Sequence, residues 1–382
     1  MHFKLSQLQE EIQKAARAFA TGEFDKDLAL ELEKNHEFPK KIWKKAAELG
    51  FIGITVPEKY GGQGLGLQEN IMVAEEFCRM DSTIGSALMF SGFGSECLLR
   101  FACDELKEKF LLKVAEGKML CGAAFTEPGQ GYDIINLNTT AAKDGDEWVI
   151  NGEKTYVING GAAGFYCLLC LTNPDSHTPE GISMILVEED RQGLSAVNSG
   201  DKLGLRMTPT SDLHFKDARV PITNLIGKEG KGVKQARAFF DESRILVGAL
   251  ALGMAQGAFD RALGYVKQRK QFGRKIAQFQ VTRHKLADMA IKIEQARFMT
   301  YWAAWNFDQG KIDAKTTSMS KMVASRTAVE VAYEAIQLLG GYGYMTEYEI
   351  ERFYRDAKNT EILEGNPAFL KNTIASAVIG KI

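Results

Sequence analysis

The hydrophobic period of the chain changes at Trp-Val-Ile-Asn-Gly-Glu-Lys-Thr-Tyr-Val-Ile, residues 148–158. Both ends of this segment are rich in β-branched and aromatic residues, which predicts two strands. Asn151-Gly152 lies between them and predicts a type I′ hairpin turn, because both residues tolerate the positive φ of that turn. Short apolar runs at 165–171 and 182–187 predict two further strands, and turn residues separate them. The middle of the chain is therefore expected to be a β domain.

Both flanks of this region have helical patterning instead. Residues 42–50, Ile-Trp-Lys-Lys-Ala-Ala-Glu-Leu-Gly, predict a helix that ends at its glycine. Five of the eight prolines lie within 128–221, whereas residues 222–366 contain none. Proline breaks a helix interior at a cost of ~3 kcal/mol, so the proline-free region predicts long helices. Helix ends are expected at Gly310 and at Gly340-Gly341. One face of a helix is predicted from the spacing of Leu286, Met289, Ile293 and Ala296.

These patterns predict an α+β fold that is mainly α and has three parts. Residues 1–120 are expected to form a helical domain, residues 121–230 a β domain and residues 231–382 a second helical domain. A length of 382 residues is consistent with two or three domains around substantial cores.

Charge and composition exclude several kinds of partner. The chain carries 47 basic and 49 acidic residues, a net charge of −2, and neither sign is concentrated at one end. Proteins that bind nucleic acid or anionic membranes present a basic field, so neither partner is expected. No run approaches the ~20 apolar residues of a membrane span, and the first residues resemble neither a signal nor a transit peptide. Six cysteines among mostly apolar neighbours argue against a disulfide framework, so we expect a reducing, cytoplasmic location.

Several common catalytic motifs are missing from the sequence. It contains neither a dinucleotide-binding G-x-G-x-x-G after a strand nor a P-loop, and neither H-E-x-x-H nor G-x-S-x-G. The five histidines are far apart, so no metal site is expected. Cys167-x-x-Cys170 lies in a strand pattern, where residues three apart point to opposite faces; we therefore expect core packing rather than redox chemistry.

Three glycine-containing segments occur in a fixed order along the chain. They read Ala-Phe-Thr-Glu-Pro-Gly-Gln-Gly-Tyr-Asp at 124–133, Arg-Lys-Gln-Phe-Gly at 269–273 and Gln-Leu-Leu-Gly-Gly-Tyr-Gly at 337–343. Gln280 follows the second, and Tyr-Arg-Asp-Ala-Lys at 354–358 and Leu-Glu-Gly at 363–365 follow the third. Supporting segments are Pro-Glu-Lys-Tyr-Gly-Gly at 57–62 and Lys-Leu-Gly-Leu-Arg at 202–206. This ordered set resembles the acyl-CoA dehydrogenase family over essentially the whole chain.

The resemblance implies a fold, a cofactor and partners. The expected fold is an N-terminal helical domain, a middle β-barrel domain and a C-terminal four-helix bundle. FAD would lie between the last two domains, and helices of a neighbouring subunit would complete its site. The expected reaction is α,β-dehydrogenation of an acyl-CoA thioester in a homotetramer that passes electrons to electron-transferring flavoprotein.

The resemblance also assigns site residues. Glu364 corresponds to the base that removes the α-proton, and a carboxylate in a dry pocket has the raised pKa that this role needs. The substrate would contact Tyr132, Asp241, Arg244 and Gly365. FAD would contact Phe125, Thr126, Gly131, Tyr132, Tyr156, Ile158, Arg269, Phe272, Gln280, Gln337, Gly340, Gly341 and Asn366. Ser243 stands where some relatives carry their base and lacks the chemistry for that role.

The residues alone leave structural alternatives open at each of these positions. The loop at 126–131 is equally consistent with a turn between domains, and Gly340-Gly341 with a helix C-cap. Arg269 suits a pyrophosphate but also a solvated helix end. Arg244 is consistent with a purely structural ion pair, and Glu364 with an exposed carboxylate in the loop before Pro367.

Three positions depart from the pattern of the family. Tyr132 and Ile158 replace residues that usually carry a small hydroxyl, and Asn366-Pro367 replaces a pair that usually begins with threonine. Loss of a hydroxyl near flavin N5 would disfavour the reduced anionic flavin by ~1 kcal/mol. We therefore expect an atypical, branched or alicyclic acyl group or a shifted flavin potential. Residues 84–90 carry no charge, which argues against a dicarboxylyl substrate.

Two other functions remain open at this point. The same scaffold could work as an enoyl-CoA reductase, because sequence fixes neither the flavin potential nor the electron partner. It could also be a non-catalytic flavoprotein subunit, although a retained Glu364 has no purpose in a scaffold.

Overall fold

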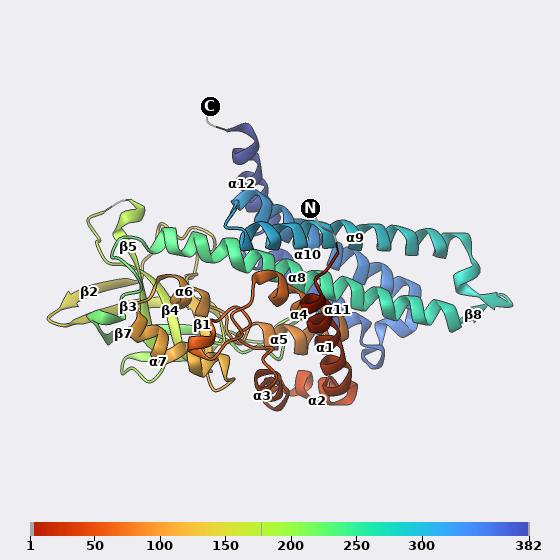
Figure 1. Cartoon of the computed structure of the whole chain (residues 1–382), viewed down its shortest axis with the longest axis horizontal. Coiled ribbons are helices and arrows are strands. Elements are labelled where there is room, and N and C mark those ends of the chain that lie inside the picture. The colour runs from red at the N-terminus through yellow and green to blue at the C-terminus, as the bar shows by residue number, and fades with distance from the viewer. Residues whose placement is uncertain (1–3, 177, 381–382) are drawn as a thin grey trace.

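The computed structural model describes residues 4–176 and 178–380 (Figure 1). A helical N-terminal part, a curled β-sheet and a long helical C-terminal part follow one another along the chain, as predicted. In Figure 1 the sheet occupies one end of the molecule and the long helices extend away from it. Within the described residues, none of the helices combines the length and apolarity needed to cross a membrane.

The N-terminal part consists of short helices packed around buried aromatic and aliphatic side chains. They are α1 (Gln7–Glu23), α2 (Lys26–Asn35), α3 (Lys40–Glu48), α4 (Leu67–Met80), α5 (Ser82–Met89), α6 (Ser95–Phe101) and α7 (Asp104–Ala115). The predicted helix at 42–50 is confirmed as α3, which is followed by Gly50 at a φ of 78°. Helix α4 is buried on most sides because α1 and α8 pack against it.

The middle part is a seven-stranded sheet that curls around its own core. Its strands are β1 (Leu120–Ala124), β2 (Thr140–Asp144), β3 (Glu147–Ile158), β4 (Ala163–Leu171), β5 (Ile182–Glu188), β6 (Leu194–Asn198) and β7 (Thr210–Pro221). The order is β1-β4-β2-β3-β7-β6, and β5 pairs with β4. The strands predicted at 165–171 and 182–187 are confirmed as β4 and β5.

The predicted hairpin turn at Asn151-Gly152 is wrong, because both residues lie inside the single strand β3. The hairpin turn instead follows Asp144, which pairs with Glu147. Asn151-Gly152 forms a β-bulge, where the register with β7 shifts and Gly152 adopts a φ of 144°. A Cβ at Gly152 would lie 2.6 Å from the Cα of Thr139, so glycine is needed here for close approach as well as for its φ.

Strand β4 separates two layers of the core. Its side chains alternate, so Cys167 packs into the cluster shared with the long helices and Cys170 into the opposite cluster. Both are free, buried thiols, and burial raises the pKa of Cys170 to about 12. The expected core role of the pair is therefore confirmed.

Long helices dominate the C-terminal part, as the absence of proline predicted. They are α8 (Gly232–Gln268), α9 (Gln280–Asp308), α10 (Ala314–Leu339), α11 (Ile350–Ile362) and α12 (Pro367–Ile379). Helix α8 has 37 residues and is about 55 Å long at 1.5 Å per residue. In Figure 1 it runs from the sheet to a small hairpin at the far end, made of β8 (Lys270–Gln271) and β9 (Arg274–Lys275). Gly310 follows the end of α9, and Gly340, at a φ of 61°, ends α10, both as predicted.

Short 3-10 turns connect these elements. They are η1 (Glu58–Tyr60), η2 (Pro179–Gly181), η3 (Ile222–Asn224), η4 (Ile276–Gln278), η5 (Gly340–Tyr344) and η6 (Thr346–Tyr348).

A buried aspartate fixes α11 to the other two parts of the chain. Asp356 accepts hydrogen bonds from Ser82 Oγ at 2.6 Å, Thr83 Oγ1 at 2.5 Å and the Leu205 N–H at 2.6 Å. The first two donors lie at the start of α5 and the third in the loop between β6 and β7. Because a buried carboxylate must be hydrogen-bonded, these three contacts constrain the position of α11 against the other two parts.

Candidate active site

Glu364 is buried at the point where α11 ends. It follows Leu363, the C-cap of the helix, and adopts a left-handed φ of 61°. Only 8% of its surface is exposed, so an exposed loop carboxylate is excluded. Burial raises the pKa of Glu364 to about 6, although the hydroxyl of Ser243 and the charges of Arg244 and Lys321 act in the opposite direction. A carboxylate with this pKa is suited to proton abstraction near neutral pH.

Two consecutive residues of α8 hold Glu364. Ser243 Oγ donates to Glu364 Oε2 at 2.7 Å, and Arg244 Nε donates to the Glu364 carbonyl at 3.1 Å. Arg244 is buried, and its Nη1 lies 3.8 Å from Oδ1 of Asp241. Asp241 also accepts from Thr317 Oγ1 at 3.1 Å. Arg244 therefore lies beside Glu364, and Asp241 lies beside Arg244.

Sequence reasoning missed a buried lysine next to this carboxylate. Lys321 of α10 is fully buried, and its Nζ donates to the Glu361 carbonyl at 3.1 Å and the Gly365 carbonyl at 2.7 Å. Burial lowers its pKa to about 7. A signal was present in the sequence, because a helical period of three and four places Lys321 on the buried face of α10. That face continues with Ala324, Ala328, Val331 and Ala335.

Tyr132 covers the other side of the same loop. Its hydroxyl donates to the Ile362 carbonyl at 2.5 Å, and its ring stacks on Phe369 with centroids 5.5 Å apart. Phe369 in turn lies 5.9 Å from the guanidinium of Arg244. Sequence reasoning did not identify Phe369.

The residues after Glu364 start the last helix. Asn366 is the N-cap of α12, and its Oδ1 accepts from the Phe369 N–H at 2.9 Å, with Pro367 in the first helical position. Gly365 has a φ of 110°, and a Cβ there would lie 3.0 Å from Leu370 Cδ2. Glycine at 365 thus permits both the backbone conformation and the close contact with α12.

The loop at 126–131 brings sheet residues to the same place. Phe125 packs edge-on against Phe240 of α8, with ring centroids 5.8 Å apart. The Thr126 carbonyl accepts from the Thr155 N–H at 2.9 Å, so Thr126 lies beside the start of the segment that carries Tyr156 and Ile158. Tyr156 is 70% exposed at a φ of 54°, and Ile158 is half-buried.

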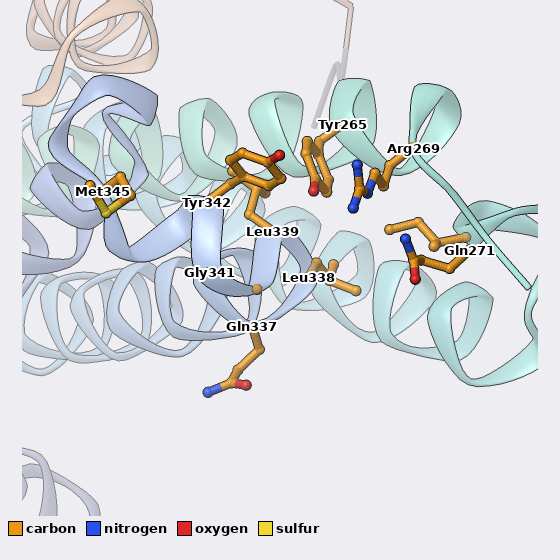
Figure 2. A pocket seen from close by; sticks show the side chains of 11 residues that line it. Tyr265, Arg269, Gln271, Gln337, Leu338, Leu339, Gly341, Tyr342 and Met345 are labelled. Carbon is orange, nitrogen blue, oxygen red and sulfur yellow. The ribbon is translucent and has the colours of Figure 1, made fainter.

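A second group of predicted residues surrounds a cavity of about 500 Å³ at the C-terminal end of α8. The lining includes Arg269, Gln337, Gly340 and Gly341. In Figure 2 the Arg269 and Tyr265 side chains point toward Tyr342, whereas the Gln337 side chain extends away from them. Arg269 lies 5.5 Å from the Tyr342 ring centroid and makes no ion pair with any described residue.

Two further predicted residues, Phe272 and Gln280, are close in sequence to the lining residues Gln271 and Ile276 but do not themselves line the cavity. Phe272 lies at the tip of the β8–β9 hairpin and is 92% exposed, with a φ of 50°. Gln280 is the first residue of α9.

One chain does not bring the two groups together. Arg244 and Arg269 are 25 residues apart along α8, a distance of about 38 Å at 1.5 Å per residue. The predicted site residues therefore fall into two separate groups, one around Glu364 and one around Arg269, which we call the two half-sites.

Family models for acyl-CoA dehydrogenases match nearly the whole chain. The N-terminal domain model matches residues 6–118, the middle domain model residues 122–218 and the C-terminal domain model residues 230–379.

Individual relatives agree with this match. The chain is 40% identical to the acryloyl-CoA reductase (NADH) of Anaerotignum propionicum, over 99% of this chain and 96% of that protein. Butyryl-CoA dehydrogenase from Megasphaera elsdenii superposes with a TM-score of 0.95 at 34% identity, covering 100% of both chains. A chain in a structure of the electron transferring flavoprotein of Acidaminococcus fermentans superposes with a TM-score of 0.96 at 37% identity, also covering both chains fully. The chain belongs to the acyl-CoA dehydrogenase family of FAD-dependent oxidoreductases.

Proposed function

We propose that the protein catalyses α,β-dehydrogenation of an acyl-CoA thioester, with Glu364 as the base. The observation that carries this proposal is the buried Glu364 carboxylate, which accepts one hydrogen bond from Ser243 and has a pKa raised to about 6. Such a carboxylate is ionised at neutral pH and basic enough to take the α-proton of a thioester.

The backbone of Glu364 supplies a second element of the mechanism. Its N–H donates to no other atom of the described residues, so it is free to bind the thioester oxygen. A hydrogen bond to that oxygen would acidify the α-proton. Arg244 donates to the Glu364 carbonyl and so restrains the backbone on the other side of the same residue.

The residues of the two half-sites fit FAD. Tyr156 offers an exposed ring for stacking, and a Cβ added at Gly131, Gly340 or Gly341 would meet no atom within 4 Å. Arg269 supplies an unpaired cation for a pyrophosphate. Phe125, Thr126, Ile158 and Asn366 would contact the flavin end, and Phe272, Gln280 and Gln337 the nucleotide end. When bound, the flavin would accept the β-hydride.

The separation of the half-sites supports an oligomer in which two chains complete each FAD site. We propose a homotetramer, and electron-transferring flavoprotein as the electron acceptor. The similarity to a chain in the structure of such a flavoprotein supports this partner. Five of the six cysteines are buried and all are free, which supports a cytoplasmic location.

The side chains around Glu364 support an atypical or short acyl group in the substrate. The Tyr132 ring and Phe369 occupy the space over the loop that carries Glu364. Aromatic side chains at this position reduce the volume that an acyl chain can occupy.

Reduction of an enoyl-CoA is the second candidate function. It is favoured by the 40% identity to a protein named acryloyl-CoA reductase. Glu364 would then return a proton to the α-carbon instead of removing it.

An anaerobic visible spectrum of the purified protein tests these alternatives. Under the main proposal one or more saturated acyl-CoAs bleach the flavin band, and Glu364→Gln abolishes bleaching while FAD stays bound. Glu330→Gln, which removes a surface carboxylate on α10, is the matched control and should leave bleaching unchanged. Reoxidation of the reduced protein by enoyl-CoA, without bleaching by any saturated thioester, would favour the reductase. Full activity of Glu364→Gln would refute both.

A further inference from the structure

A buried ammonium group links both sides of the loop that carries the base. Lys321 Nζ contacts the Glu361 carbonyl at the end of α11 and the Gly365 carbonyl on the far side of Glu364. The last carbonyls of a helix have no partner within it, and a cation is a favourable donor there. The same group therefore caps the helix and ties down the residue beyond the base.

The loop needs this stabilisation because Glu364 has a backbone conformation that is unfavourable for a residue with a side chain. Glu364 has a φ of 61° and Gly365 a φ of 110°. The left-handed conformation is energetically unfavourable for a residue other than glycine. It persists only where contacts with the surrounding structure enforce it. Among the described residues, no carboxylate lies at salt-bridge distance from the fully buried Lys321 ammonium. Burial of such a group is costly, which indicates that it has a function.

We infer that Lys321 is a positioning residue for Glu364, fixing the backbone from which the carboxylate points and favouring its ionised form. This inference rests on the function proposed above. The pKa of about 7 for Lys321 is consistent with a group that is charged when the base is titrated.

Other charged groups also face this cluster. Glu361 lies on α11, Arg244 on α8 and Glu364 in the loop, and all three influence the Lys321 charge. From the sheet side, Tyr132 is the titratable group that faces Glu364. Arg244 remains in every Lys321 variant, so a change in the Glu364 pKa between variants reports the loss of Lys321 alone.

Amide hydrogen exchange tests the backbone role without any substrate. The first variant, Lys321→Met, removes both hydrogen bonds and the charge. The second, Lys321→Gln, keeps an N–H donor group but loses the charge. In Lys321→Met we expect exchange of the peptide covering 359–369 to be at least about tenfold faster than in the wild type. Ser318→Ala on the same helix is the control, because its buried hydroxyl has no partner among the described residues. Unchanged exchange in Lys321→Met would overturn the inference.

The pH profile of kcat/KM in Lys321→Gln tests the charge. Loss of a nearby cation should move the acid limb upward by about one pH unit, an effect that a purely structural lysine would not produce. An unmoved limb in a folded, FAD-loaded Lys321→Gln protein contradicts the inference. If Glu364→Gln keeps full activity, the proposed function has failed, and the exchange experiment still decides whether Lys321 positions the loop.

Discussion

Ser243 Oγ donates a hydrogen bond of 2.7 Å to Oε2 of Glu364, so α8 and the end of α11 meet at the carboxylate. The hydroxyl stabilises the ionised form, whereas burial destabilises it. The balance leaves a carboxyl group that is a stronger base than an exposed glutamate but is still ionised at neutral pH.

This balance predicts the pH dependence of activity. In the wild type, kcat/KM should rise as pH increases through about 6, because Glu364 must lose its proton to act as a base. Ser243→Ala removes a donor to the carboxylate, raises its pKa and should move the rising limb to higher pH. Ser243→Thr keeps the hydroxyl and should retain the wild-type limb. A limb that stays in place in Ser243→Ala would show that the hydrogen bond has no influence on the base.

Tyr132 is expected to limit the size of the acyl group. Tyr132→Ser removes the ring that stacks on Phe369, so kcat/KM for longer acyl-CoAs should rise about tenfold relative to short ones. Tyr132→Phe keeps the ring and loses only the hydrogen bond to Ile362, so its preference should match the wild type. Equal widening in both variants would contradict a steric role.

Ile158 is expected to affect the flavin potential. Ile158→Thr introduces a hydroxyl donor worth ~1 kcal/mol to the reduced flavin, which corresponds to about +20 mV for a two-electron couple. Spectroelectrochemical titration of the holoenzyme measures this shift. Ile158→Val, which has almost the shape of threonine without the hydroxyl, should leave the potential unchanged. A shift of equal size in both variants would point to packing instead.

Mixed oligomers test whether two chains share each FAD site. Arg269→Ala should release FAD, and Glu364→Gln should retain it without turnover. Co-expression of the two variants should restore about a quarter of wild-type activity, because random pairing combines one intact half-site of each kind at that frequency. No recovery in stable mixed oligomers would mean that both half-sites act within one chain.

The β-bulge in β3 gives a prediction on stability. Gly152→Ala combines a positive φ with a Cβ only 2.6 Å from the Cα of Thr139, and should lower the free energy of unfolding by about 2 kcal/mol or more. Gly145→Ala also has a positive φ but meets no atom within 4 Å, so its cost should be about 1 kcal/mol. Denaturant unfolding of both variants gives the difference. Equal losses would mean that the clash at Thr139 relaxes at no cost.

Sequence patterns predicted elements whose signals are local. The absence of proline predicted the long helices α8, α9 and α10, and short apolar runs predicted β4 and β5. Asn151-Gly152 misled because its two residue types serve a bulge as well as a turn, and the choice depends on Thr139 and Asp217. Only the folded sheet brings those partners to the pair.

The contacts around Glu364 could not be predicted from the sequence. Glu364 was identified from the resemblance, yet its burial depends on α8 and α10, which are distant in sequence. Ser243 lacks the chemistry of a base, and its role as a hydrogen-bond donor to Glu364 follows only from the folded structure. Lys321 has the helical spacing of a core residue, but the sequence does not reveal that two carbonyls near position 364 accept hydrogen bonds from its ammonium group.

The length of α8 is itself constrained. Deleting one residue between Arg244 and Arg269 would turn the ends of the helix by about 100° relative to each other and shorten it by about 1.5 Å. Because Ser243 and Arg244 in the first half of the helix donate to Glu364, and Arg269 follows its last residue, such a deletion would misalign one of these groups even though no site residue had changed. Engineering of this scaffold should therefore place insertions and deletions in surface turns such as the one at Gly145, and keep the residue count of α8 fixed.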